Sequence, residues 1–399
     1  MAARIVYREE KDFDTEKNAQ ENTIIVTSRE AVNASGHVDQ LDRQYGLLSI
    51  CATALTIDSA WVALGGSITV AVANGGAPGI IYEFLASCVY YGFVATSIAE
   101  LASSIPSAGG VYHWASVAGG KYGRVVGFFT GLINLYGWIF GLAAIVTIPA
   151  NVAVQMYVVF HPDFVVQPWQ IFLAFVLINW FCCLTVIFFN RFMPTLQRFG
   201  LFMIVVGELV TIIVRLPNPM HPPQFVFIDW ENATGWSGGV AFLTGMLNGA
   251  FAIGTPDSVT HMAEELPHPR KDLPRAIAAQ ILLAPGFVYT VALMFAITDL
   301  DAVLASNGSF PLAAVYAQAT GNKAGIFSLL CMSDASNWAL ARDNVTPFSR
   351  FFSKSISTTY GSFVILSTTS YAMAILPHLL SGRKNVPQGP FWMAELASS

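Results

Sequence analysis

Residues 239–261 read GVAFLTGMLNGAFAIGTPDSVTH, an apolar run that glycines and a proline interrupt. About 20 mostly apolar residues suffice to cross the hydrocarbon of a bilayer as a helix. Pro256 cannot supply the amide that a helical turn requires, so Gly254-Thr255-Pro256-Asp257 predicts an unwound turn in this span, to which Gly245 and Gly249 contribute. Such backbone is tolerated at membrane depth only where protein or a water-filled cavity surrounds it. The stretch therefore predicts a membrane protein with a polar interior.

The composition of the whole chain agrees with a lipid environment. Of its 399 residues, 54% are hydrophobic and 11% are charged, and the mean hydropathy is +0.55. This is more apolar surface than one soluble core needs. A net charge of -5 provides no basic field for nucleic acid, so we expect no nucleic-acid partner. The five cysteines lie in apolar stretches without ligand spacing, so we expect neither a metal nor a cofactor.

Apolar length predicts an all-α, multi-pass transmembrane bundle. Residues 1–45 are polar and predict a disordered cytosolic tail, 46–384 a transmembrane domain of about eight or nine spans, and 385–399 a C-terminal tail. The predicted spans are 47–73, 80–103, 125–148, 171–189, 196–216, 239–261 and 277–298, followed by two weaker candidates at 324–341 and 361–380.

The basic residues orient these spans, because Lys and Arg are retained on the cytosolic side. Six of them lie in residues 1–45 and seven in the loops after the second, fourth and sixth spans, against two in the alternate loops. The N-terminus is therefore expected in the cytosol. The sequons at Asn232 and Asn307 then lie outside the cell, where glycosylation is expected.

The first span is interrupted in the same manner as the sixth. It contains Leu64-Gly65-Gly66-Ser67 and ends in the sequence NGGAP at 74–78. Two broken helices five spans apart indicate a transporter with two inverted halves and a central site. Amides around 65–67 would bind a carboxylate, and carbonyls around 253–255 would bind an ammonium group. The alternative is that the glycines only allow close helix packing.

Three carboxylates stand inside predicted spans, where a charge is costly and usually faces a cavity or a partner. Asp257 could attract a cation or a coupling ion, or could cap the half-helix after Pro256. Glu208 could relay protons or form an interhelical hydrogen bond as the neutral acid, and Asp58 has a structural or a coupling role.

Aromatic side chains beside the breaks could bind an ammonium group through cation–π attraction. Trp61 and Phe251 are the candidates, with packing as the alternative role. His261 is expected to pack or to cap a helix. The chain shows no Ser, His and Asp order, metal-spaced His cluster or phosphate-cradling loop, so an enzyme is not expected.

Five stretches resemble the fungal choline and gamma-aminobutyrate permeases of the amino acid, polyamine and organocation superfamily. They are DRQYGLLS at 42–49, AWVALGGS at 60–67, AELAS at 99–103 with 106–114, HMAEE at 261–265 with 267–274, and ALARDN at 339–344 with 347–349.

The resemblance implies a twelve-span protein with a five-plus-five inverted repeat. Such a protein moves choline, gamma-aminobutyrate, an amino acid or a polyamine by alternating access, typically coupled to protons. It implies that Glu264 and Glu265 stabilise the inward gate, although they could form a solvated charge pair with Arg270 and Lys271. The residues that it makes the natural substrate-binding positions are Gly65, Gly66, Ser67, Phe251, Gly254 and Asp257, beside which Trp61 and Thr255 lie.

The chain departs from this pattern near its end. Residues 325–332 are followed at once by the polar SDASN, too short for a secure eighth span, and the ninth span is absent. The second repeat is thus incomplete, and Arg383 and Lys384 fit a cytosolic exit only if span eight does not cross. The alternative function is a transport-defective chain that acts as a binding or regulatory membrane protein. The plasma membrane is the expected location, with the vacuolar membrane as the alternative.

Overall fold

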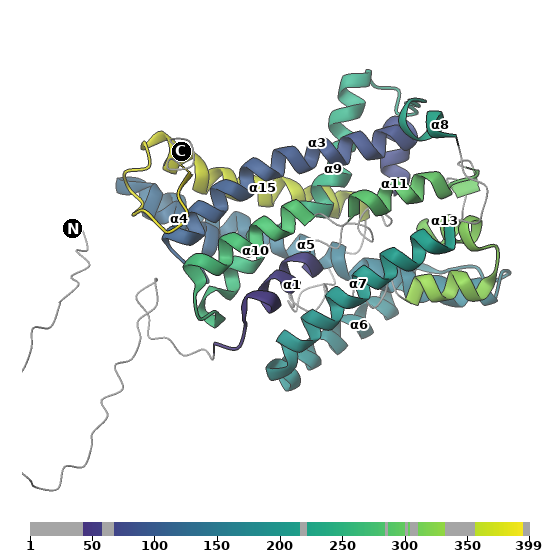
Figure 1. Ribbon diagram of the computed structural model, residues 1–399, viewed down its shortest axis with the longest axis horizontal. Helices are drawn as coiled ribbons and strands as arrows, with labels where there is room; N and C mark the ends of the chain where they lie inside the picture. The colour runs from purple at the N-terminus through teal and green to yellow at the C-terminus, as the bar shows by residue number, and fades with distance from the viewer. Residues whose placement is uncertain are drawn as a thin grey trace, which may run out of the picture.

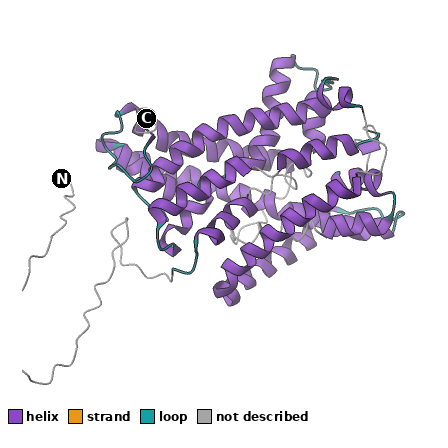
Figure 2. Ribbon diagram, viewed as in Figure 1, coloured by secondary structure: helices purple, strands orange, loops and turns teal. Residues whose placement is uncertain are grey.

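The computed structural model describes residues 43–57, 68–215, 222–283, 286–299, 302–303, 310–331 and 356–393. Within these ranges the chain is helix, turn and loop, without a strand (Figure 2). The long helices lie side by side as one bundle (Figure 1). The predicted all-α class is therefore confirmed.

Most helices follow the predicted apolar segments. Their bounds are α1 Leu47–Ile57, α3 Ile68–Ser104, α4 Gly110–Ala118, α5 Gly123–Phe160, α6 Pro168–Phe189, α7 Met193–Arg215, α8 Pro223–Phe227, α9 Gly238–Ile253, α10 Pro269–Leu283, α11 Gly286–Ala296, α13 Leu312–Thr320 and α15 Ile356–Leu380. Three 3₁₀ turns join them, namely η1 Gly120–Tyr122, η2 Asn190–Phe192 and η3 Ser258–Glu265.

Six helical segments in the described part are long and apolar enough to span a membrane. They are Val72–Ser104, Gly120–Phe160, Pro168–Ile213, Gly238–Glu265, Pro269–Ala296 and Ser362–Leu380. Their outer faces carry large apolar side chains such as Phe93 and Phe188, each 72% exposed, as lipid contact requires. The multi-pass membrane architecture is therefore confirmed. Of the weak candidate at 324–341, only 324–331 is described, and it is helical.

The sequence NGGAP at 74–78 kinks a helix instead of ending it. α3 continues from Ile68 to Ser104 across Gly76, whose φ of 67° and ψ of -155° lie in a region that glycine adopts without strain. At the neighbouring Gly75, a Cβ atom would lie 2.6 Å from the Trp230 ring. The kink thus brings the outer loop before α9 against the start of α3.

Gly245 and Gly249 do not interrupt the sixth span, contrary to expectation, because α9 is regular up to Ile253. They form a close contact with α3 instead. The carboxyl group of Glu83 lies over Gly245, where an added Cβ would meet it, and Ser87 Oγ donates to the Met246 carbonyl at 2.9 Å. For these two glycines, the packing interpretation is the correct one.

The C-terminal residues fold over the ends of α3 and α4. Asn385 Nδ2 donates to the Ala118 carbonyl at 2.9 Å, and the Phe391 amide donates to Ser103 Oγ at 2.9 Å. The same end carries Lys121, and Figure 1 shows the loop that follows α15 beside α4. Arg383 therefore lies at the end that the charge rule assigns to the cytosol.

Candidate functional site

The sixth span contains the predicted break. α9 ends at Ile253, residues 254–257 are unwound, and η3 begins at Ser258. The carbonyls of this turn are buried and already have protein partners. The Tyr371 hydroxyl lies 3.2 Å from the Gly254 oxygen, and the Thr255 oxygen accepts from both Gln280 Nε2 and the Ser258 amide, each at 3.1 Å. A carbonyl oxygen has two lone pairs, so that of Gly254 can accept one further donor, whereas both lone pairs of Thr255 are used.

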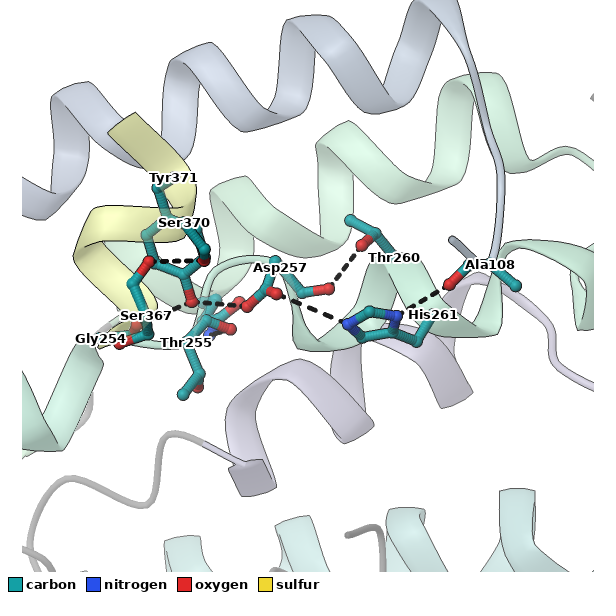
Figure 3. Close-up of polar contacts among 10 residues, drawn as sticks. Ala108, Gly254, Thr255, Asp257, Thr260, His261, Ser367, Ser370 and Tyr371 are labelled. Atoms are coloured by element: carbon teal, nitrogen blue, oxygen red, sulfur yellow. Dashed lines mark hydrogen bonds and ion pairs between the residues drawn. The ribbon is translucent and has the colours of Figure 1, made fainter. Parts of the chain in front are cut away.

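Asp257 is completely buried beside this break. Its Oδ1 accepts a hydrogen bond from Tyr371 Oη at 2.6 Å, and its Oδ2 lies 3.5 Å from His261 Nε2 (Figure 3). The carboxylate caps no amide of η3. Asp257 thus occupies the N-cap position of η3 without a side-chain capping hydrogen bond, because its side chain turns toward α15 instead.

His261 joins this carboxylate to the loop that follows α3. Its Nδ1 lies 2.8 Å from the Ala108 carbonyl, and its ring meets the Trp138 indole edge-on, 5.9 Å between centroids. Its side chain is 34% exposed, whereas that of Asp257 is 1% exposed. His261 is therefore more than a packed residue, because it contacts both the buried acid and a solvent-accessible space.

That space is a cavity of about 370 Å³ below the break. Its lining includes Tyr45, Trp138, Asn190, Ser258, His261 and Glu265. Tyr45 precedes the first span, so the cavity lies at the end of the bundle that the charge rule assigns to the cytosol. The cavity reaches the His261 side chain but stops short of Asp257.

Glu265 ties the end of η3 to the segment before α1. Gln44 Nε2 donates to Glu265 Oε2 at 2.9 Å, and the Tyr45 amide donates to the Glu265 carbonyl at 3.2 Å. Glu265 is thus hydrogen-bonded to the segment that precedes α1. Glu264 is half-buried beside it.

The other predicted positions divide into two groups. Phe251 is buried at the end of α9 and meets Phe363 edge-on, 6.0 Å between ring centroids. Glu208 on α7 has a buried Oε1 without a hydrogen-bond partner among the described residues, so the expected interhelical bond from that oxygen is not found there. The positions outside the described residues are Asp58, Trp61, Gly65, Gly66, Ser67 and Asn307.

Two further carboxylates inside the spans are buried and are not among the site residues predicted from the sequence. Glu83 and Glu100 stand inside an apolar span, where the rule applied to Asp257 also singles them out. Both oxygens of Glu83 lack hydrogen-bond partners in the described part. Tyr371 gave no signal, because a tyrosine is ordinary in an apolar helix.

Glu100 anchors a buried polar cluster at the C-terminal end of α3. Its Oε1 lies 3.2 Å from His378 Nε2 and 3.5 Å from the Arg383 guanidinium, and its Oε2 accepts from the Met393 amide at 3.3 Å. The Arg383 guanidinium also lies over the Trp392 ring at 5.9 Å. This cluster holds the C-terminal segment in place, away from the break.

Comparison with known proteins agrees with this architecture. The choline transporter of Saccharomyces cerevisiae is 29% identical over 423 residues, covering 92% of this chain and 74% of that protein. The GABA-specific permease of the same organism is 25% identical over 349 residues, covering 80% of this chain and 60% of that protein. The alignment with the choline transporter is longer than this chain, so that protein has residues without a counterpart here.

A solved structure shows a similar fold. It is a nucleobase-cation-symport-1 family transporter in a closed conformation with bromovinylhydantoin bound, with a TM-score of 0.51 and 12% identity over 90% of this chain and 78% of that one. The amino acid permease family model matches residues 46–386. This chain therefore belongs to the amino acid permease family and is a multi-pass membrane transporter.

Proposed function

We propose that this permease carries a small compound with an amino or ammonium group, such as choline, gamma-aminobutyrate, an amino acid or a polyamine, and that protons drive it. The observation that carries the proposal is the buried carboxylate of Asp257 beside the unwound turn. A carboxylate that is removed from water attracts a cation more strongly than a solvated one. Gly254 adds a carbonyl oxygen that complements an ammonium group, and Thr255 follows it in the same unwound turn.

The remaining candidate positions complete the proposed site from the first span. Gly65, Gly66 and Ser67 would present amides to a substrate carboxylate. Trp61 and Phe251 would face the ammonium group through their rings. The names of the choline and GABA relatives fit this substrate class.

Uptake by cells that lack the corresponding permeases tests the proposal. Cells expressing this chain are expected to take up radiolabelled choline, gamma-aminobutyrate or an amino acid saturably, and Asp257→Asn is expected to reduce that uptake tenfold to a hundredfold. Loss of a charged hydrogen-bond partner costs roughly 1.5–3 kcal/mol, and about 1.4 kcal/mol is tenfold. Glu231→Gln, at an exposed acid in the outer loop, is the matched control. Equal uptake by Asp257→Asn would exclude Asp257 from the site.

A second candidate is a transport-defective chain with a binding or regulatory role. It is favoured by the residues of the choline transporter that have no counterpart here, since rocking one half against the other needs both halves. The same assay decides between the two candidates. Correctly located protein that takes up none of these compounds favours the second.

Glycosylation tests the proposed orientation, in the plasma membrane or the vacuolar membrane. Asn232 is exposed in the loop between α8 and α9, and its Oδ1 accepts from the Thr234 hydroxyl at 2.6 Å. If this loop faces outward, the expressed protein is expected to lose apparent mass on endoglycosidase treatment, and Asn232→Gln is expected to reduce this loss. Asn179→Gln, inside α6, is the control that leaves it unchanged. A wild-type chain without glycan at Asn232 contradicts the expectation.

A further inference from the structure

The contact between Asp257 and His261 lacks a hydrogen that one of the two facing atoms could donate to the other. His261 Nδ1 lies 2.8 Å from the Ala108 carbonyl, which can only accept, so Nδ1 carries a hydrogen. In the neutral imidazole, Nε2 then presents a lone pair. That lone pair faces Asp257 Oδ2 at 3.5 Å, and neither atom has a hydrogen-bond partner in the described part.

Two lone pairs facing each other, one of them on a fully buried carboxylate, are unfavourable, and one added proton removes the conflict. The proton either lies on Oδ2 and points toward Nε2, or lies on Nε2 and points toward the carboxylate. In both forms the pair carries the same total charge. We propose that Asp257 and His261 together hold one exchangeable proton, which His261 passes between Asp257 and the cytosolic cavity.

The difference in exposure gives the proton its route. Asp257 is closed to solvent, whereas His261 is 34% exposed and lines the cavity. Because Nε2 itself is buried, a proton from the cavity reaches it when the imidazole ring turns, and transfer from Nε2 to Oδ2 then breaks one N–H bond and forms one O–H bond. Because 3.5 Å exceeds a good hydrogen bond, transfer requires the two atoms to approach by a few tenths of an ångström.

Among the side chains around the pair, His261 is the one that contacts both the buried carboxylate of Asp257 and the cavity. On the buried side, Tyr371 of α15 donates to the other carboxylate oxygen and so does not compete for Oδ2. On α5, the neighbour of the ring is the uncharged Trp138. The other titratable side chains that line the cavity are Tyr45 and Glu265, and Glu265 is bound by Gln44.

This inference rests on proton coupling in the proposed function, and transport in liposomes separates the two. With a pH gradient imposed and radiolabelled choline or gamma-aminobutyrate as the probe, the wild type is expected to accumulate one of them. His261→Gln keeps an amide that can donate to Ala108 but cannot carry the proton. It is expected to retain exchange of label between the two sides and to lose accumulation at least tenfold. His268→Gln, at an exposed histidine seven residues on, is the matched control.

The outcomes are distinct. Accumulation by His261→Gln equal to that of the wild type overturns the inference and leaves the proposed function intact. If the wild type transports neither probe, the proposed substrate class fails, and NMR of the protein with ¹⁵N-labelled histidine decides the inference without substrate. A histidine signal with hydrogen on Nδ1 is expected to respond to pH and to shift in Asp257→Asn. If no signal of the wild type shifts in that variant, the inference is wrong, whether or not His261→Gln folds.

Discussion

Replacing Glu100 with alanine is expected to lower the free energy of unfolding by about 3–5 kcal/mol, the range for a buried ion pair that loses one partner. Glu100 and His378 are each only 2% exposed in their side chains, and the Arg383 guanidinium lies 3.5 Å from the carboxylate. Without Glu100, the Met393 amide also loses its acceptor. The Arg383 side chain is 27% exposed and water screens part of its charge, so the lower end of the range is expected.

Thermal unfolding of the purified protein in detergent measures this effect. Glu100→Gln retains an acceptor for the Met393 amide while removing the charge, and is expected to fall between the wild type and alanine. Glu231→Ala, at an exposed carboxylate outside the cluster, is expected to unfold like the wild type. If Glu100→Ala and Glu231→Ala unfold at the same temperature, the cluster does not stabilise the protein.

Replacing Gly249 with valine is expected to cost roughly 1–3 kcal/mol, the usual penalty for overpacking a close contact. A Cβ at this position would lie 2.7 Å from Ser87 Oγ and 3.0 Å from the Phe84 Cα atom. The Ser87 side chain can rotate away, but the backbone of α3 cannot, so α9 must move outward. This displacement would also disturb the break, which begins five residues later at Gly254.

Gly239 provides the matched control on the same helix, since a Cβ there meets nothing within 4 Å. Gly239→Val is expected to leave both the unfolding temperature and the yield of monodisperse protein near the wild-type values. Equal behaviour of the two valine variants would show that α3 and α9 do not need their close approach.

The sequence predicted those features that local chemistry determines. The break at 254–257 follows from Gly254 and Pro256 alone, and the structure places it there. The bundle follows from apolar length, since six described segments are long enough to span. Tertiary contacts could not be predicted from local sequence. The hydrogen-bond partner of Asp257 is Tyr371, which lies 114 residues away. Without that contact, a helix cap was as reasonable a role for Asp257 as a site residue.

The number of basic residues in each loop did not suffice to orient the C-terminal end of the chain. Counting Lys and Arg orients the first seven spans, but it could not place Arg383 while the crossing of 324–341 was undecided. Two hydrogen bonds to Ser103 and Ala118 decide the side, because they join segments more than 260 residues apart. For glycines the difficulty is different. Gly245 and Gly254 are the same residue type in the same span, yet only the second lies in unwound backbone.

The hydrogen bonds from Gln44 and Tyr45 to Glu265 have a kinetic consequence. They fasten the entry of the first span to the end of the sixth span's cytosolic half. While both bonds hold, the two segments move together rather than independently. Labels placed on the two segments are therefore expected to report the same relaxation time when this end of the bundle opens.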